Sequence, residues 1–167
     1  KEDFFDPKAV HFDILERFFQ LDQKTQQNIK EFFYVPDLKS EKEDILLLTQ
    51  QFSNLGQLSF ENHVLIYQNL FDYYFKDKHV IIKPHPDDIL YYDILFPKAR
   101  IIKEKFPSEL LPTAFSAIPN MISTISSTGT HLVRKYFANR LEFNALYERT
   151  FLFNHLYLYA LLLCRHL

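Results

Sequence analysis

The stretch IKPHPDD, residues 82–88, carries side chains that could bind and protonate a phosphate group. His85 stands between two prolines, after Lys83 and before two aspartates, which we expect to form a solvated turn. A histidine held rigid by its neighbours suits a proton donor beside a leaving phosphate. It could equally be a turn residue with no chemical role, so the histidine alone does not decide the function.

A second candidate site is the stretch SSTG, residues 126–129, which precedes a predicted helix. Hydroxyl groups together with the free backbone N–H groups of a helix N-terminus suit an anion such as phosphate. Ordinary capping of the helix by Ser or Thr would use the same residues. Ser126, Ser127 and Thr128 are therefore candidates for binding a phosphate, with capping as the alternative.

Four apolar segments lead into these polar residues and are predicted to be strands. They are residues 45–50, 79–84, 99–104 and 120–126. Helices are predicted between them and at both ends, at residues 7–33, 59–76, 89–96, 106–114, 127–138 and 141–163. Alternating strands and helices predict an α/β fold with a Rossmann-like parallel sheet flanked by helices. Because ligands bind beyond the carboxyl ends of such strands, the residues that follow the four strands should converge on one edge.

The chain divides into three predicted segments: a helical N-terminal segment at 1–36, a linker at 37–44, and a Rossmann-like domain with C-terminal helices at 45–167. Asp22 and Ser59 are predicted helix caps. The apolar run 151–164 is shorter than the roughly 20 residues that span a bilayer. We predict that it is a buried helix, with contact to a membrane surface as the alternative.

The composition excludes several classes of function. Two glycines in 167 residues cannot form a Gly-rich dinucleotide fingerprint or a Walker loop. A net charge of −2 gives no support for nucleic-acid binding. The single cysteine excludes a disulfide within the chain, and its spacing from the histidines does not resemble a zinc site.

Three motifs in order, IIKPHP, FPSELL and ISTISST, resemble those of bacterial sialyltransferases. The likeness is to the lipooligosaccharide and capsule enzymes and the related polysialyltransferases, and it covers about residues 45–135. It implies the C-terminal, nucleotide-binding half of a GT-B glycosyltransferase. It also implies CMP-sialic acid as donor, inversion at the transferred sugar, and no metal or other cofactor.

The resemblance implies a role for each matching residue. His85 is the general acid toward the phosphate of CMP, and Lys83 and Pro84 lie where the cytosine binds. Glu109 accepts hydrogen bonds from the ribose hydroxyls. The phosphate is held by Ser126 and Ser127, with Thr128 a near alternative.

The chain departs from this family where a general base is expected. The family carries an acidic pair followed by glycine after the earlier strand, whereas QQFSNLGQLS places Asn54 and Leu55 there and matches only at Gly56. Neither residue can remove a proton from an acceptor hydroxyl. The possible base region is therefore Asn54 together with Glu61 and His63 on the next helix, with a solvated helix face as the alternative for the last two.

We therefore predict a sialyltransferase-like enzyme that transfers sialic acid to a cell-surface glycan of lipooligosaccharide or capsule. The alternatives are another CMP- or CDP-linked transferase, such as a polyol-phosphate polymerising enzyme, and a non-catalytic nucleotide-sugar-binding fragment. The expected partners are the donor and a glycan or glycolipid acceptor, with a homo-oligomer and peripheral membrane contact as further options and no nucleic acid. The expected location is the cytoplasm, at the inner face of the membrane.

Overall fold

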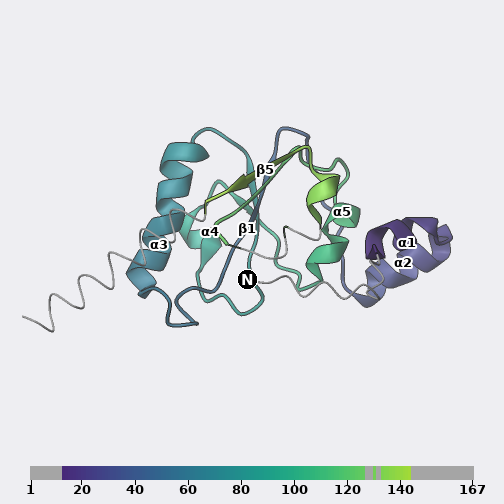
Figure 1. Ribbon diagram of the computed structural model, residues 1–167, viewed down its shortest axis with the longest axis horizontal. Coiled ribbons are helices and arrows are strands. Elements are labelled where there is room, and N and C mark those ends of the chain that lie inside the picture. Colours follow the sequence, from purple (N-terminus) through teal and green to yellow (C-terminus); the bar gives the residue numbers. More distant parts are fainter. Residues whose placement is uncertain (1–12, 127–129, 131–132, 144–167) are drawn as a thin grey trace, which may run out of the picture.

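The computed structural model describes residues 13–126, 130 and 133–143, and this part of the chain folds around a parallel sheet of five strands (Figure 1). The strands are β1 (Ile45–Leu48), β2 (Val80–Lys83), β3 (Arg100–Ile101), β4 (Met121–Thr124) and β5 (Asn139–Glu142). Their order in the sheet is β3-β2-β1-β4-β5, and every neighbouring pair is parallel. This architecture confirms the predicted α/β fold with a Rossmann-like sheet.

Helices cover both faces of the sheet. One face carries α3 (Phe60–Asn69), which continues into the π-helical turn η1 (Leu70–Tyr74), and α4 (Tyr92–Leu95). The other carries the 3₁₀ turn η2 (Ser108–Leu110) and α5 (Leu111–Ala114). The helices α1 (Ile14–Gln20) and α2 (Gln23–Phe32) lie beyond α5 at one end of the molecule (Figure 1), and the 3₁₀ turn η3 (Arg134–Tyr136) precedes β5.

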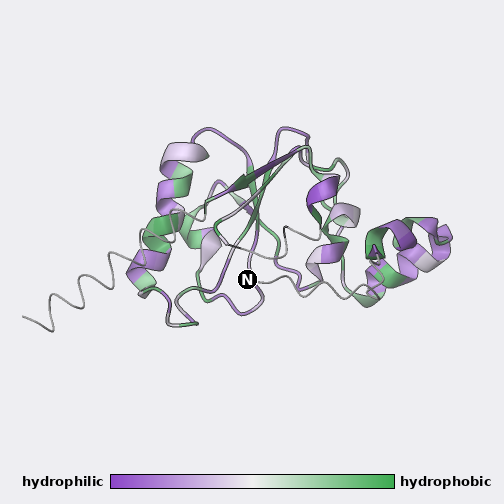
Figure 2. Ribbon diagram, in the orientation of Figure 1, coloured by the Kyte–Doolittle hydropathy of each residue, from purple (hydrophilic) through white to green (hydrophobic). Residues whose placement is uncertain are grey.

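The apolar run of β1 supplies two cores at once. Leu46 and Leu48 pack with α1, η2 and α5, whereas Ile45 and Leu47 pack with α3 and α4. All four side chains are buried, as a parallel strand covered on both faces requires. Figure 2 shows hydrophobic and hydrophilic residues mixed along α1, α2 and α3, as expected of helices with one face on a core.

The helices begin where capping side chains accept backbone hydrogen bonds. Asp22 accepts from the Thr25 N–H at 3.0 Å, and Ser59 Oγ accepts from the Asn62 N–H at 3.3 Å. Both predicted caps are therefore confirmed. Asp13 caps α1 in the same way. It also pairs with Lys135 of η3, and so joins α1 to the segment before β5.

Two predictions about secondary structure are wrong. Residues 141 and 142 were predicted to begin a helix, but they belong to β5, which pairs with β4 over its whole length. A strand at the edge of a sheet needs few buried residues, so a polar segment such as NRLE lacks the apolar pattern by which strands are predicted. The third strand is also shorter than predicted, because only Arg100–Ile101 pair with β2. Most of the predicted C-terminal helix lies outside the described residues.

The segment 37–44 contacts the sheet domain at several points. The Leu38 N–H donates to the Ala114 carbonyl at 2.7 Å, and the Ser40 hydroxyl donates to the Ala117 carbonyl at 2.7 Å. Leu38 and Ser40 are buried. The division of the chain at 36 and 44 stays a prediction. Within the described residues, no helix has both the length and the apolar character needed to cross a bilayer.

Candidate active site

The segments after β1, β2 and β4 meet at the carboxyl edge of the sheet. Gln50, after β1, donates from Nε2 to the carbonyl of Ser126, after β4, at 3.1 Å. Asn54, also after β1, donates from Nδ2 to the carbonyl of Asp87, after β2. Three of the four groups of residues expected at one edge are therefore in direct contact.

The backbone of His85 is fixed from below by the end of β1. The His85 N–H donates to Thr49 Oγ1 at 3.1 Å, and the same hydroxyl donates to Asp88 Oδ2 at 3.1 Å. The Asp88 N–H in turn donates to the His85 carbonyl at 2.9 Å. Because none of these bonds involves the imidazole, the loop keeps its shape independently of the histidine side chain.

Asp88 is a half-buried anchor that accepts several hydrogen bonds, contrary to the prediction of a solvated turn. Its carboxylate also accepts from the Tyr92 hydroxyl at 2.5 Å and from the Leu90 N–H at 3.2 Å. Burial raises the pKa of Tyr92, so its hydroxyl stays protonated and continues to donate. The prediction holds for Asp87, whose side chain is 72% exposed. The two neighbouring aspartates therefore have different roles.

The His85 ring is oriented by the backbone that follows it. Its Nδ1 accepts from the Asp87 N–H at 3.2 Å, and Asp87 Oδ2 lies 4.0 Å from the same nitrogen. In a neutral imidazole this leaves the proton on Nε2. The side chain is 30% exposed, so it is partly accessible while its backbone is held.

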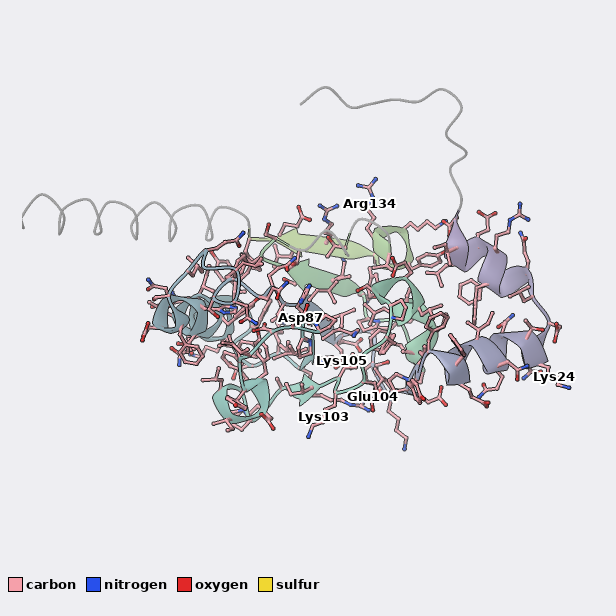
Figure 3. All side chains as sticks on the ribbon, turned by 90° about the horizontal axis from the view of Figure 1, so that it is seen from below. Lys24, Asp87, Lys103, Glu104, Lys105 and Arg134 are labelled. Carbon is pink, nitrogen blue, oxygen red and sulfur yellow. The ribbon has the colours of Figure 1, made fainter. Side chains whose placement is uncertain are left out.

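His85 lines a cavity of about 530 Å³ between the segments that follow β2 and β3. Polar and charged side chains form much of its wall. The lining residues include Pro84, Asp88, Tyr91, Lys103, Glu104 and Lys105. Figure 3 shows Lys103, Glu104 and Lys105 on the segment after β3, together with Asp87 after β2. The cavity thus combines a histidine, two lysines and three carboxylates, those of Asp88, Asp93 and Glu104.

Lys83, at the end of β2, is buried and does not belong to the lining of this cavity. Its Nζ lies 4.3 Å from the centroid of the Phe106 ring and donates to the Glu104 carbonyl at 3.4 Å. Burial lowers the pKa of Lys83 to about 8, although the Glu104 carboxylate opposes the shift. Lys83 therefore holds the segment after β3 in place through its contacts with Glu104 and Phe106. Its predicted contact with cytosine stays a prediction.

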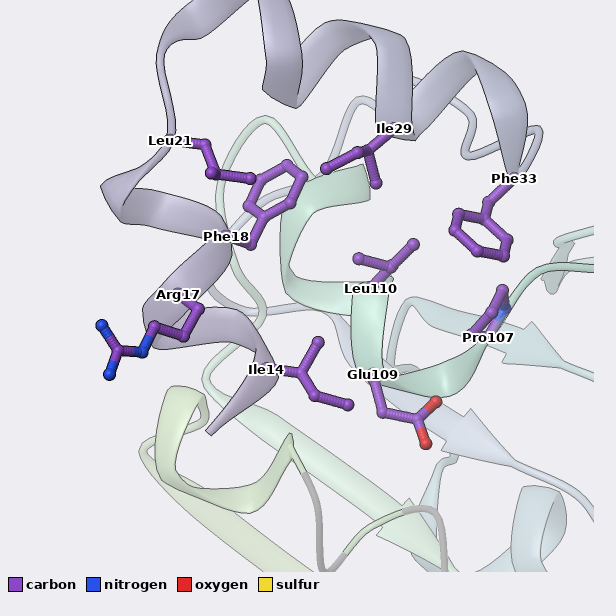
Figure 4. Close-up of a pocket in the computed structure, with 9 residues that line it drawn as sticks. All are labelled: Ile14, Arg17, Phe18, Leu21, Ile29, Phe33, Pro107, Glu109 and Leu110. Carbon is purple, nitrogen blue, oxygen red and sulfur yellow. The ribbon is translucent and has the colours of Figure 1, made fainter. Parts of the chain in front are cut away.

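Glu109 lines a different pocket from His85. This pocket of about 500 Å³ lies between α1, α2 and η2, and its walls are mostly apolar. In Figure 4 Phe18, Ile29 and Leu110 face one another across it, and the Arg17 side chain points away from Glu109. The structure does not bring Glu109 into the cavity of His85, and its role toward a ribose stays a prediction.

The predicted serine pair lies only partly within the described residues. Ser126 is exposed at the carboxyl edge, where its carbonyl accepts the hydrogen bond from Gln50. Ser127 and Thr128 lie outside the described part of the chain. Their proposed contact with a phosphate stays a prediction.

The possible base region contains one clear error of prediction. Asn54 is exposed, and so is Glu61, as predicted, but His63 is fully buried instead of lying on a solvated face. Its ring packs against the rings of Phe52 and Tyr67, each at 5.5 Å between centroids. The spacing of His63, Ile66, Tyr67 and Leu70 is that of the buried stripe of a helix, which was the signal available in the sequence.

Comparisons with known proteins agree with the likeness seen in the motifs. The model of the family described as alpha-2,8-polysialyltransferase (POLYST) matches residues 10–128. An uncharacterized protein of Haemophilus influenzae (strain ATCC 51907 / DSM 11121 / KW20 / Rd) is 28% identical over 126 residues, which cover 70% of this chain and 40% of that protein. This chain thus matches less than half of its relative's length.

No solved structure matches the chain. The family match extends over more than half of the sequence and includes the segments after β1 and β2. The chain therefore belongs to the alpha-2,8-polysialyltransferase family.

Proposed function

We propose that the cavity beside His85 binds the CMP part of CMP-sialic acid, and that the protein transfers the sialic acid to a cell-surface glycan with inversion and without a metal ion. The observation that carries this proposal is His85 itself. Its backbone is fixed by Thr49, and its Nδ1 is occupied by the Asp87 N–H. The ring therefore presents an Nε2 proton at the carboxyl edge of the sheet, in a member of the polysialyltransferase family.

The chemistry follows from charge that develops on the leaving group. When the bond between sialic acid and CMP breaks, the phosphate gains negative charge, and a hydrogen bond from His85 Nε2 stabilises it. Lys103 and Lys105 line the same cavity and can each pair with a phosphate oxygen, although Asp88, Asp93 and Glu104 balance their charge in the wall. The hydroxyl of Ser126, with Ser127 and Thr128, is the proposed second set of donors to this phosphate.

Two carboxylates are candidates for the ribose hydroxyls. The resemblance implies Glu109, which lines the apolar pocket beside α1 and α2. Glu104 lines the cavity that contains His85. Since one nucleotide has to reach both the histidine and the carboxylate, the shared cavity favours Glu104. The described sheet would then be the nucleotide-binding half of a GT-B enzyme, with the acceptor bound elsewhere.

A second candidate function is donor binding without catalysis. It is favoured by Asn54, which stands where the family has an acid and whose amide is engaged by the Asp87 carbonyl. Such a domain would bind CMP but would not cleave CMP-sialic acid. A third candidate is a CDP-linked transferase, which would bind CDP more tightly than CMP.

Calorimetric titration with CMP, CDP and UMP tests the proposal. We expect CMP to bind most tightly and His85→Ala to weaken it by about tenfold, the value of one charge-assisted hydrogen bond. His79→Ala is the matched control, because His79 lies just before the other end of β2 with a side chain 91% exposed. A folded chain that does not bind CMP would contradict the proposal. Incubation with CMP-sialic acid then separates an enzyme from a binding domain.

A further inference from the structure

His63 and Ser53 form a polar pair beside the proposed donor site. His63 Nδ1 lies 2.9 Å from Ser53 Oγ and 3.4 Å from the Ser53 backbone nitrogen. His63 is fully buried on α3, whereas Ser53 is half-buried in the segment after β1. The hydroxyl of a half-buried residue therefore contacts a fully buried imidazole.

The pair adjoins the loop that carries His85. Ser53 directly precedes Asn54, whose side chain donates to the Asp87 carbonyl. In the other direction, three residues away, Gln50 bonds to the Ser126 carbonyl. Ser53 thus belongs to a segment that touches both the His85 loop and the segment after β4. It also lies within the stretch where the family carries its acidic base.

The hydrogen bonds indicate how the imidazole is protonated. If the Ser53 N–H and hydroxyl both donate to Nδ1, the ring is neutral and its proton lies on Nε2. This Nε2 is buried and has no hydrogen-bond partner among the described residues. A buried polar atom without a partner is rare in folded proteins and is often connected with function.

The surroundings of His63 permit it to take up a proton. Burial lowers the pKa of His63 below its ordinary value, so the ring is neutral and free to accept near pH 7. The charge of Asp88 acts in the opposite direction and would stabilise an imidazolium once formed. The backbone of Gln50 also favours the protonated ring, and the aromatic side chains of Phe52 and Tyr67 pack against it.

We infer that Ser53 and His63 together supply the general base that the sequence lacks at Asn54, with Ser53 touching the acceptor hydroxyl and His63 holding the proton. This inference rests on the proposed function. The acceptor oxygen forms a bond to the anomeric carbon of sialic acid, and the bond from that carbon to CMP breaks with its electron pair on the phosphate. The acceptor's proton passes to Ser53 Oγ while the hydroxyl proton of Ser53 passes to His63 Nδ1.

Two variants separate this role from a purely structural one. Ser53→Ala removes the hydroxyl but keeps the backbone N–H that contacts His63. His63→Asn keeps an acceptor near the position of Nδ1 but cannot take up a proton at neutral pH. Ser59→Ala is the control, because Ser59 caps the same helix, α3, and its loss perturbs the helix without touching the pair.

The measurement is the rate at which CMP is released from CMP-sialic acid, with water as the acceptor, followed by ³¹P NMR across pH 5 to 8. Calorimetry with CMP accompanies it. We expect Ser53→Ala and His63→Asn to bind CMP as wild type does but to release it about 100-fold more slowly, the loss typical of a general base. The wild-type rate should fall toward the acid end of this range as His63, with its lowered pKa, is protonated. His63→Asn should lack this fall.

Each other outcome identifies what fails. A wild-type release rate in Ser53→Ala, or an equal loss in Ser59→Ala, would overturn the role of the pair and leave the donor site standing. The same holds for a wild-type chain that binds CMP but leaves CMP-sialic acid intact. A folded wild-type chain that binds no CMP would instead overturn the proposed function itself.

Discussion

The cavity beside His85 and the pocket beside Glu109 have similar volumes, about 530 and 500 Å³, but different walls. The first is lined by a histidine, lysines and carboxylates that follow two neighbouring strands. The second is lined mostly by apolar side chains of α1, α2 and η2. The first has the character of a site for a charged ligand, and the second that of an unfilled contact between helices.

The difference between the two cavities arises from how their residues are held. His85 follows its strand by two residues, so the sheet fixes its place, and Thr49, directly after the neighbouring strand β1, completes the support. Glu109 lies further from its strand, in the 3₁₀ turn after Pro107, and that turn faces the N-terminal helices. A residue close to the end of its strand is therefore a better candidate for the site at the carboxyl edge than one assigned only from the order of motifs along the chain.

The largest expected effect separates the apolar pocket from ligand binding. Leu110→Ala removes a buried side chain beneath α1 and α2 and should lower the free energy of unfolding by about 2–5 kcal/mol. The CMP affinity of the folded fraction should be unchanged, because Leu110 does not line the His85 cavity. Urea denaturation and calorimetry measure the two quantities. Loss of CMP binding in a folded variant would show that the two cavities are not independent.

The next effect concerns the anchor of the His85 loop. Asp88→Ala removes the acceptor of three hydrogen bonds, including that of the buried Tyr92 hydroxyl, and should lower the free energy of unfolding by about 2–3 kcal/mol. CMP binding should weaken as well. The matched control is Asp87→Ala, where an exposed side chain should change stability by less than about 0.5 kcal/mol. Equal effects at the two aspartates would contradict the network.

A pH-dependent effect is expected at Lys83. Its folded pKa of about 8 lies below the ordinary 10.5, so between these values the unfolded chain binds more protons and the stability contributed by Lys83 rises with pH. Lys83→Met should therefore exceed wild type in stability at pH 7 by about 1–3 kcal/mol. This advantage should shrink by pH 10.

Denaturant unfolding of both proteins at pH 7 and pH 10 measures the change at Lys83. Lys78→Met is the control, since Lys78 is exposed and its replacement should show no such pH dependence. An advantage of Lys83→Met that stays constant with pH would mean that the lysine is charged to the same extent in the folded and unfolded chain.

The smallest effect distinguishes the two candidate carboxylates. Glu104→Gln should weaken CMP binding by about tenfold, since a neutral amide accepts hydrogen bonds from the ribose hydroxyls less strongly than a carboxylate. Glu109→Gln should change it by less than about twofold. Calorimetry on the pair of variants measures the difference. A larger loss of CMP affinity in Glu109→Gln than in Glu104→Gln would indicate that Glu109 binds the ribose and that the nucleotide extends across both cavities.

The sequence was sufficient to predict the fold and the place of His85. Continuous apolar runs such as ILLL mark strands buried on both faces, and the polar residues after them mark the edge of the sheet. The sequence could not show that Asp88 turns inward while Asp87 faces solvent. The difference depends on hydrogen bonds that the Thr49 and Tyr92 hydroxyls donate to the Asp88 carboxylate in the folded chain. The burial of His63 could have been predicted from its helical spacing with other buried residues, but its polarity led to the prediction of a solvent-exposed position.

Amide chemical shifts of the ¹⁵N-labelled chain, recorded as CMP is added, test the central claim most directly. The claim predicts shifts at Gln50, His85, Asp88, Lys103 and Glu104, around the cavity at the carboxyl edge. It predicts no shifts at Phe18, Ile29 and Leu110, around the apolar pocket. Shifts confined to the apolar pocket, or no shifts at saturating CMP, would contradict it.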